Sequence, residues 1–453
     1  MERNDVDAVL HLGDYLYEYA AGSGVDGRTE EPANEIISLS DYRTRYSHYR
    51  LDPDCREVHC QYPFITVWDD HESANNSWMN GAENHDPGTE GPWVDRLNNA
   101  TQAYLEWLPI RENPSDTSRL YRKIEYGDLV NIYMLDTRIE GRDEQVAATS
   151  SDIDDPNRSI LGDDQMTWLK NELSASTAKW NVIGQQVMMA PLEVFGIPVN
   201  ADQWDGYRAD RDELRDHIMN NGIENVVVLT GDIHTSWAND LPGASYNAGA
   251  GTGAFGVEFV TTSVTSSSSP IGVGTGIITA ANPHMQWIDL TEKGYMTIDM
   301  NKNRTQCDWW FVDNITTQSP AESLGNAYFT NDGDNHLVQA SQPAQRDVQD
   351  CSLAPGLPII VGIEEQIAAE VVIVGAYPNP FDQEVIVQYN MTNGQNVTVE
   401  VLDAMGKIVW TEQRMTASGL NYVKIDGAEL SGGMYTFVIR TDKWKATQRI
   451  VRL

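Results

Sequence analysis

The feature that most constrains this sequence is a buried strand that ends in a carboxylate. The apolar run at residues 6–12 is typical of a strand covered on both faces, and it ends at Gly13-Asp14, where the chain must turn out of the sheet. Ligands of open α/β sheets bind at the carboxyl ends of the strands, so Asp14 is a candidate site residue. If a short helix follows Asp14, Tyr17 lies on the same face and can converge with it on one centre.

The same arrangement recurs along the chain. The apolar run 64–68 is followed by DDHE at 69–72, the run 129–135 by DTR at 136–138, and the run 225–229 by TGDIH at 230–234. Carboxylates gathered at one edge of a sheet repel one another unless a cation neutralises them. The pattern therefore points to metal ions at this edge.

Helical periodicity alternates with these strands and predicts a mostly parallel sheet covered by helices. We expect helices at 41–51, 98–108, 162–173 and 210–219, and further strands at 180–189, 257–264, 294–299 and 305–312. The serine- and glycine-rich stretch 265–281 is expected to form a mobile loop. GTGAFG at 251–256 matches the dinucleotide motif GxGxxG, but it precedes a strand instead of joining a strand to a helix, so we reject it.

Several motifs together resemble one known family. GDYLY at 13–17, WDDHESANNSW at 68–78, LDTR at 135–138, WNVIGQQVMMAPL at 180–192 and GDIHTSWANDL at 231–241 occur in the order typical of PhoD-like alkaline phosphatases. That family is a branch of the calcineurin-like metallophosphoesterases. The resemblance extends from about residue 5 to about residue 312. For residues 1–313 it implies an α/β fold, a four-layer αββα sandwich with two sheets face to face between helices.

The resemblance also implies a set of metal ligands. They are Asp14, Tyr17 and His234 for iron (Fe³⁺), and Asp70, Asn76 and Asp232 for neighbouring calcium (Ca²⁺). The residue chemistry agrees, since a carboxylate has an oxygen for each of two metals and a phenolate ligates only a strongly Lewis-acidic ion. The carboxylates Asp70 and Asp232 stand where the wider superfamily has an amide and an imidazole. Such hard oxygen ligands favour calcium alongside iron over a pair of zinc ions.

Two further residues are candidates for catalysis. His71 directly follows Asp70 and is expected to contact the phosphate as an acid. Arg138 is expected to clamp the phosphate, because a guanidinium matches phosphate oxygens in charge and geometry.

Structural roles remain open for several of these residues. The alternatives are helix caps for Asp14, Asp232 and Asn76, a packing role for the Tyr17 ring, a structural imidazole for His71, and a surface salt bridge for Arg138.

Net charge and cysteine spacing restrict the class of protein. The 67 acidic and 31 basic residues give a formal charge of −36, which disfavours duplex nucleic acid and anionic membranes as partners. No run of about eighteen apolar residues predicts a transmembrane segment. Cys55, Cys60, Cys307 and Cys351 form no metal-binding pattern. Two disulfides are permitted by the even count, but the spacing does not establish them.

Composition changes after about residue 313. Residues 314–370 are polar and read as an extension and linker, whereas 371–453 show short alternating strands at 385–389, 397–402, 407–411, 420–425 and 434–440. These strands predict a small all-β sandwich. YPNPF at 377–381 and SGGMYTFV at 431–438 resemble the C-terminal sorting domain of type IX secretion substrates. The alternative is a carbohydrate-binding or adhesion sandwich.

The sequence therefore predicts a secreted or cell-surface metal-dependent alkaline phosphatase or phosphodiesterase. Small-molecule phosphate mono- or diesters are the expected substrates, attacked by a metal-activated water or hydroxide, and the type IX secretion machinery is the expected partner of the C-terminal segment. The alternatives are a phospholipase-D-like diesterase and a catalytically impaired surface-binding protein that keeps the fold.

The start of the sequence adds one expectation. The resemblance implies an earlier strand that brings a further metal ligand, and no signal peptide precedes residue 6. We therefore expect the native protein to extend upstream and the 453-residue chain to bind iron weakly.

Overall fold

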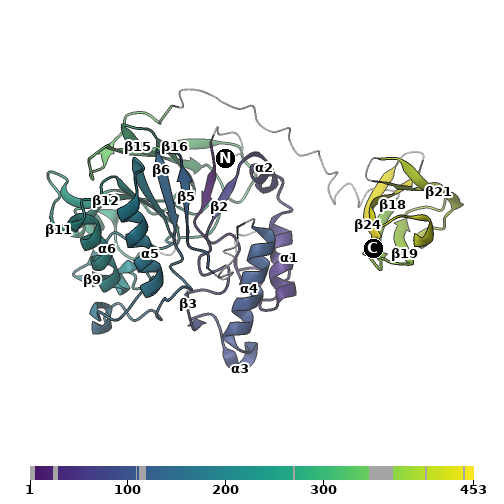
Figure 1. The fold of residues 1–453 in the computed structure, drawn as a ribbon, viewed down its shortest axis with the longest axis horizontal. Coiled ribbons are helices and arrows are strands. Elements are labelled where there is room, and N and C mark those ends of the chain that lie inside the picture. Colours follow the sequence, from purple (N-terminus) through teal and green to yellow (C-terminus); the bar gives the residue numbers. More distant parts are fainter. Residues whose placement is uncertain are drawn as a thin grey trace. The chain divides into compact units, whose positions relative to one another are not determined.

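The protein consists of two compact units, Met1–Gly356 and Leu357–Leu453 (Figure 1). The computed structural model describes residues 6–23, 29–108, 110–111, 119–268, 271–345, 371–403, 406–441 and 444–452. None of the helices in these ranges is long and apolar enough to cross a membrane.

A seven-stranded mixed sheet forms the centre of the first unit, in the order β13-β11-β12-β10-β7-β6-β5. Its strands are β5 (Arg122–Tyr126), β6 (Val130–Met134), β7 (Trp180–Gly184), β10 (Val226–Thr230), β11 (Ser236–Asn247), β12 (Thr252–Val260) and β13 (Met285–Asp289). The four strands β12, β10, β7 and β6 are parallel, β13 runs in the same direction, and β11 and β5 run antiparallel to them. Every residue of β6, β7 and β10 is buried, which explains their continuous apolar sequence.

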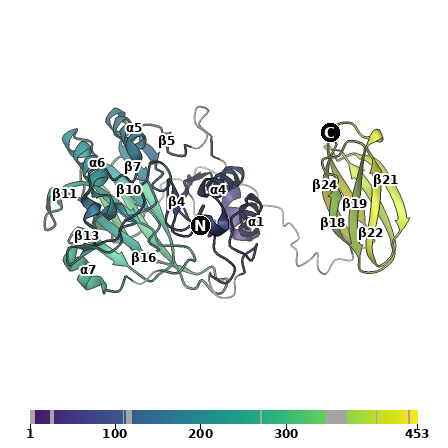
Figure 2. The ribbon, with the colours of Figure 1, turned by 90° about the horizontal axis from the view of Figure 1, so that it is seen from below.

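The two faces of this sheet are covered by different layers. Helices α5 (Gly162–Ala175) and α6 (Arg208–Asn220) pack on one face, and a second sheet packs on the other (Figure 2). The second sheet contains β14 (Gly294–Met300), β15 (Arg304–Val312), β16 (Glu322–Asn331) and β17 (Val338–Gln339). Ile183 belongs to the helix-side core, whereas its neighbour Val182 meets Trp309 of the second sheet's core. The predicted α/β class with two facing sheets is confirmed.

A parallel pair, β1 (Val9–His11) and β2 (Phe64–Thr66), carries the first two predicted motifs. Beside it, α1 (Leu39–Tyr49) and α4 (Trp93–Trp107) bury Leu16, Tyr42, Tyr46 and Tyr104 in a core of their own. The remaining elements are α2 (Pro53–Gln61), α3 (Pro87–Glu90), β3 (Ser77–Trp78), β4 (Gly81–Ala82), β8 (Glu193–Val194), β9 (Ile197–Pro198), α7 (Thr275–Ala281) and the 3-10 helices η1 (Ser151–Asp154) and η2 (Trp204–Gly206).

Two segments differ from the sequence prediction. Helix α7 occupies the end of the stretch 265–281, which we predicted to be a loop. Strands β16 and β17 extend the second sheet beyond residue 313, where we placed the start of a linker; Tyr328 of β16 pairs with Cys307 of β15. The first residues of β16 are exposed, so polar side chains are tolerated there and hide the strand pattern.

The second unit contains two antiparallel sheets, as its alternating pattern predicted. One has the order β18-β19-β22 and the other β21-β20-β23-β24. Their bounds are β18 (Val371–Tyr377), β19 (Glu384–Met391), β20 (Asn396–Leu402), β21 (Ile408–Met415), β22 (Gly419–Asp426), β23 (Gly433–Arg440) and β24 (Lys445–Arg452), with η3 at Gly427–Glu429. Val387 and Ile425 of the first sheet share one core with Val399 and Phe437 of the second.

The cysteines do not form the two disulfides that their number permits. Cys55, Cys60 and Cys307 are free thiols, and Cys351 lies outside the described residues.

Candidate metal centre

Backbone strain is concentrated at four of the predicted metal ligands. Asp14, Asn76, Asp232 and His234 have φ angles of 56°, 50°, 60° and 57°, in the left-handed region. That conformation costs a non-glycine residue about 1–3 kcal/mol and persists where the surroundings enforce it, typically at functional sites. In the part of the chain that the structure describes, only two other non-glycine residues, Phe195 and Asn225, share it.

The turn at Gly13 brings the first two motifs into contact. Gly13 has a φ of 117°, and a Cβ there would lie 2.3 Å from the Cβ of Asp69, so only glycine fits. The buried carboxylate of Glu72 accepts the backbone N–H groups of Asp14 at 3.0 Å, Tyr15 at 2.5 Å and Asp69 at 2.7 Å. Burial, followed by the charge of Asp14, raises the pKa of Glu72 to about 8. Glu72 therefore fixes the backbone that presents Asp14.

The three predicted iron ligands meet at one point. The Tyr17 hydroxyl donates to Asp14 Oδ2 at 3.0 Å and lies 3.0 Å from Nε2 of His234, which is 3.3 Å from the same Asp14 oxygen. Nδ1 of His234 donates to the carbonyl of Ser267 at 2.7 Å. Because a carbonyl only accepts, the neutral ring carries its proton on Nδ1 and leaves the Nε2 lone pair for a ligand.

The structure does not support the alternative roles of Asp14, Asp232 and Tyr17. The residues after Asp14 form a bend and no helix, and Asp232 is followed by β11, so neither carboxylate caps a helix. Tyr15 packs in the core beside α1, whereas Tyr17 presents its hydroxyl to Asp14.

His71 lies beside the same centre. Ligand atoms of Asp14, Asp70 and His71 lie within 4.8 Å of one another, and the rings of His71 and Tyr17 have centroids 4.2 Å apart. Nδ1 of His71 bonds to Glu18 Oε2 at 2.6 Å. Burial alone would lower the pKa of His71, but the charges of Asp70, Asp14 and Glu18 raise it well above its ordinary value.

Glu18 is a site residue that the sequence analysis missed. It is fully buried and also accepts the backbone N–H of Asn75 at 2.7 Å and the side-chain amide of Asn84 at 2.9 Å. Its position directly after Tyr17 was the available signal, since a carboxylate next to a predicted ligand has to be paired when it is buried.

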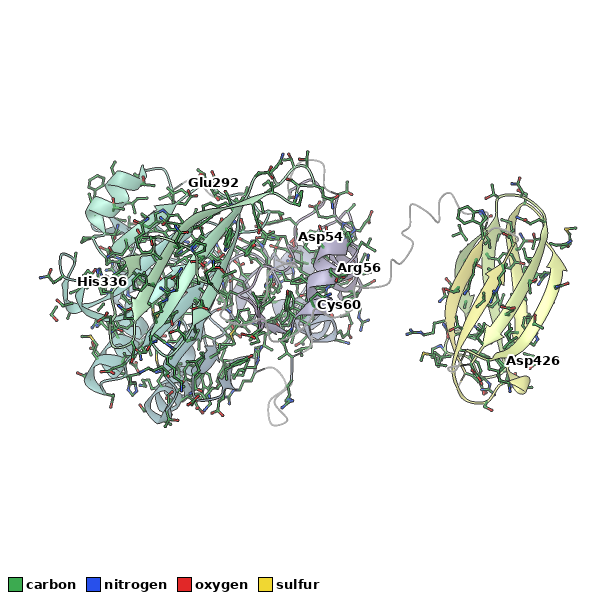
Figure 3. The ribbon with its side chains drawn as sticks, turned by 90° about the horizontal axis from the view of Figure 1, so that it is seen from above. Asp54, Arg56, Cys60, Glu292, His336 and Asp426 are labelled. Carbon is green, nitrogen blue, oxygen red and sulfur yellow. The ribbon has the colours of Figure 1, made fainter. Side chains whose placement is uncertain are left out.

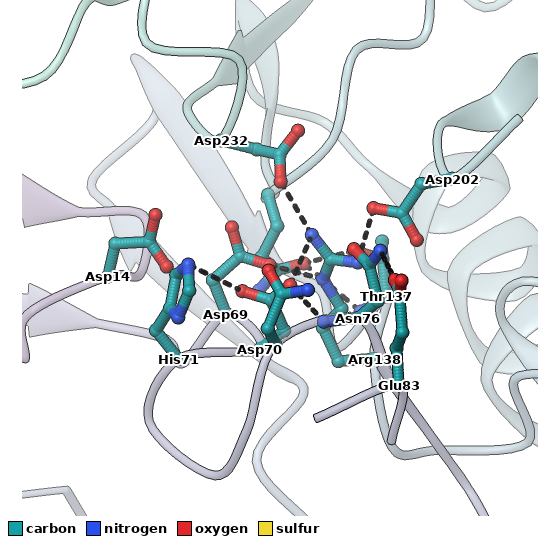
Figure 4. A network of polar contacts seen from close by, with 12 residues as sticks. Asp14, Asp69, Asp70, His71, Asn76, Glu83, Thr137, Arg138, Asp202 and Asp232 are labelled. Atoms are coloured by element: carbon teal, nitrogen blue, oxygen red, sulfur yellow. Dashed lines mark hydrogen bonds and ion pairs between the residues drawn. The ribbon is translucent and has the colours of Figure 1, made fainter. Parts of the chain in front are cut away.

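Arg138 is surrounded by carboxylates (Figure 4). Its guanidinium is fully buried; it donates to Asp69, to Asp202 Oδ2 at 2.6 Å and to Asp232 Oδ1 at 2.6 Å, and it lies 3.6 Å from Asp70 Oδ2. Burial would lower the pKa of Arg138, but Asp202, Asp69 and Asp70 raise it well above its ordinary value.

This geometry corrects both interpretations of Arg138. It is not a surface salt bridge, and its three guanidinium nitrogens face carboxylates of the protein where we expected them to face phosphate. Asp202 was missed, because it lies in a loop between β9 and η2 that carries no strand-end signal.

Asn76 contributes its backbone to the centre. Its N–H donates to Asp70 Oδ2 at 2.6 Å, and its side-chain amide donates to Glu83 Oε2 at 2.5 Å. The short strand β3 follows it, so Asn76 does not cap a helix.

The donor set fits metal ions. Asp14 Oδ1 and Asp69 Oδ2 are buried and have no hydrogen-bond partner among the described residues. Burial raises the pKa of Asp232 to about 7 although Arg138 opposes the shift, so this carboxylate lacks sufficient positive charge nearby. Carboxylate oxygens suit Ca²⁺ or Fe³⁺, and a phenol with an imidazole suits iron.

Comparison with known proteins agrees with this centre. Residues 1–309 match the model of the PhoD-like phosphatase family. The chain belongs to that family. Membership implies dependence on metal ions, and it confirms the resemblance seen in the motifs.

The most informative relatives are PhoD-like proteins. Alkaline phosphatase D of Bacillus subtilis (strain 168) is 34% identical over 384 residues, which cover 81% of this chain and 63% of that protein. The chain thus spans less than two thirds of the length of this relative. A solved structure of PhoD is similar to this PhoD-like chain, with a TM-score of 0.67 and 33% sequence identity. The match covers 77% of this chain and 68% of the chain in the solved structure.

The second unit matches a different family. Residues 375–452 match the secretion system C-terminal sorting domain. This match indicates that the PhoD-like protein is secreted or attached to the cell surface, as predicted.

Proposed function

We propose that the PhoD-like unit is a metal-dependent phosphoesterase that hydrolyses phosphate mono- or diesters at alkaline pH. The convergence of Asp14, Tyr17 and His234 beside the carboxylate cluster is the observation that supports this function best. A phosphoesterase site must neutralise phosphoryl charge and generate a nucleophile, and such a donor set can hold the ions that do both.

The ligand assignment follows from donor chemistry. We assign Fe³⁺ to Asp14, Tyr17 and His234, because a phenolate requires a strongly Lewis-acidic ion. Ca²⁺ would lie beside Asp70, Asp232 and Asn76, where the donors are oxygens. When bound, these ions supply charge neutralisation for the phosphoryl oxygens and an activated water as the nucleophile.

The protein's own residues hold this arrangement. Arg138 orients Asp69 and Asp232 while leaving Asp232 Oδ2 for a ligand. The five carboxylates of the cluster, from Asp14, Asp69, Asp70, Asp202 and Asp232, outnumber the cationic groups of Arg138, Arg142 and His71, so their full ionisation requires further positive charge, which bound cations would supply.

His71 is the proposed acid. Glu18 accepts from Nδ1 and so directs Nε2 of the ring toward the side of Asp70, from which it is 3.9 Å. In that position Nε2 can donate to a phosphate oxygen or to the leaving group.

Metal removal tests this proposal. Chelation is expected to abolish turnover of a chromogenic phosphate ester, and iron plus calcium should restore it better than zinc, because the donors are mainly carboxylates with one phenol. The measurements are turnover, metal content and visible absorption, since a phenolate bound to ferric iron absorbs in the visible. Tyr17→Phe should lose this band, and the exposed Tyr126→Phe is the matched control that should keep it. Stoichiometric zinc without iron, or a colourless active enzyme, would contradict the assignment.

The substrate class is decided by profiling. Preference for lipid diesters over monoesters would favour a phospholipase-D-like activity. A protein that binds iron and calcium stoichiometrically but turns over neither class would be a binding protein that retains the fold.

We also propose that residues 371–453 serve export through the type IX secretion machinery. The second unit has its own core, and each centre residue named above belongs to the first unit. Deleting 371–453 is therefore expected to leave turnover unchanged and to trap the protein inside the producing cell. Turnover of the purified deletion variant and its distribution between cells and medium are measured against the full chain. Loss of turnover with the first unit still folded would overturn the proposal.

A further inference from the structure

The main chain of His234 is held by an unusual number of donors. Its carbonyl oxygen accepts from Ser268 Oγ at 2.7 Å and Lys293 Nζ at 3.0 Å, and it lies 2.9 Å from Thr262 Oγ1, whose single proton it shares with the Glu292 carbonyl at 2.8 Å. The left-handed φ of 57° at His234 places this carbonyl and the ring on a strained backbone. These contacts to one oxygen support the strained conformation.

Lys293 is buried without a direct ion pair among the described residues, and Asp289 is the carboxylate whose charge acts on it from farther away. It is 8% exposed and lies between β13 and β14, directly after the exposed Glu292 that Figure 3 labels. No carboxylate among the described residues forms an ion pair with it; its ammonium donates to His234, to Ser263 Oγ at 2.9 Å and to Ser268 Oγ. Burying an ammonium group without a counter-charge is costly, so its retention here calls for a role beyond packing.

Ser266 and Ser267, which lie beside the serines contacted by Lys293, reach the side chains of two proposed iron ligands. Ser263 Oγ donates to the carbonyl of Ser266 at 2.6 Å, and the Ser266 side chain hydrogen-bonds to Tyr17. Ser267 accepts from Nδ1 of His234 at 2.7 Å, which leaves Nε2 directed toward Asp14. Lys293 thus lies at the centre of a network that holds both the backbone and the ring of His234.

We propose that Lys293 is a positioning residue for the metal centre. Through the His234 carbonyl and the serine segment 266–268, it fixes the conformation and the tautomer in which His234 presents Nε2. This inference rests on the proposed function, in which His234 binds iron.

Iron affinity of a Lys293→Met variant tests the inference. Loss of an outer partner of a metal ligand typically lowers affinity by about 10–100-fold, and we expect a decrease in this range by chelator competition, with a shift in the visible band. Lys293→Arg, which keeps a cationic donor, should restore most of the affinity. Lys179→Met, which removes a partly exposed lysine paired with Asp332, is the control and should bind iron as the wild type does.

The metal-free protein separates positioning from a purely structural role. Methionine removes an uncompensated buried charge, so the metal-free Lys293→Met variant should unfold at the same denaturant concentration as the wild type, or a higher one. Iron affinity equal to that of the wild type would overturn the inference, as would a loss of iron affinity that tracks a loss of metal-free stability. If Lys293→Met does not fold, Ser268→Ala removes one donor from the His234 carbonyl and one partner of Lys293, and unchanged affinity in that variant would also overturn it.

Failure of the proposed function is recognised separately. If the wild type binds no iron, the function fails, and the inference is then judged in the metal-free protein from the ¹⁵N chemical shifts of the His234 ring. The wild type should show Nδ1 protonated, in its bond to the Ser267 carbonyl, and Lys293→Met a mixture of states at Nδ1. Identical shifts in the two proteins would reject the positioning role.

Discussion

Replacing Asp14 with asparagine is expected to lower kcat/KM for a chromogenic phosphate ester by more than about a hundredfold, since even the loss of an outer partner of a metal ligand costs about 10–100-fold. Asparagine has nearly the same size, but it lacks the charge and one of the two oxygens that a bridging ligand needs. The Tyr17 hydroxyl and His234 Nε2 both approach Asp14 Oδ2, and Oδ1 has no protein partner among the described residues. The substitution therefore removes the group on which the centre converges.

Metal content and folding must be measured with activity. Asp14→Asn should lose iron while its far-ultraviolet circular dichroism stays unchanged. The carboxylate of Glu72 accepts the backbone N–H of residue 14, and a change of side chain leaves that hydrogen bond in place. Asp143→Asn is the control: its carboxylate accepts the N–H of Ser159 at 2.9 Å, away from the centre, and the variant should retain activity. Wild-type activity in Asp14→Asn would show that the centre forms without this ligand.

Replacing Arg138 with methionine is expected to destabilise the metal-free protein by about 3–5 kcal/mol, because removing one partner leaves buried carboxylates without compensation. Asp69, Asp202 and Asp232 all lose a hydrogen bond to the same guanidinium. Bound cations would restore part of the missing positive charge, so the loss should be smaller in the metal-loaded protein. Denaturant titrations of the chelated and metal-loaded forms measure both values.

Arg43→Met is the matched control. Arg43 pairs with Glu106 on the surface, where solvent weakens the interaction, so the midpoint of unfolding should not change measurably. If Arg138→Met were as stable as Arg43→Met without metal, the carboxylates would not depend on this guanidinium.

Arg138 illustrates how a correct residue can be given a wrong partner. Its place at a strand end identified it as a site residue, and its chemistry suggested an anion. The anions are carboxylates of the same chain, and Asp232 is 94 positions away in the sequence. The excess of carboxylates at this edge was visible in the sequence, but which of them the guanidinium neutralises was not.

Local patterns predicted the strands and the ligands at their ends. Strands covered on both faces, such as β6, β7 and β10, are continuously apolar. A run of adjacent apolar residues can be recognised in the sequence without knowledge of the fold. Asp232 follows a strand of this kind, whereas Asp14 follows β1, which is only partly buried and pairs with β2 in a separate two-stranded sheet. Each carboxylate was located at a strand end by the local pattern, but their meeting depends on how the two sheets pack. The alternating pattern of the second unit similarly predicted two packed antiparallel sheets, because one face of each strand is buried.

Other elements carry no comparable local signal. Strand β11, with the sequence SWANDLPGASYN, contains polar residues and a proline and was not predicted. It is an antiparallel strand between β12 and β13. Hydrogen bonding to these two neighbours stabilises it, so its sequence does not need an apolar periodicity. Strand β16 was missed for a related reason. Its first residues are exposed to solvent, so polar side chains can occupy them and no apolar pattern marks the strand.

The sequence by itself determined the fold class and the strand ends that carry most of the candidate ligands, because each depends on the order of neighbouring residues. Only the tertiary structure decided how those ligands are held. Asp14 and His234 meet across 220 positions, and Glu18, Asp202 and Lys293 gain their roles from contacts with residues distant in sequence. Such contacts depend on how the strands and loops pack in three dimensions, and the residues that make them carry no periodicity that a one-dimensional pattern can reveal.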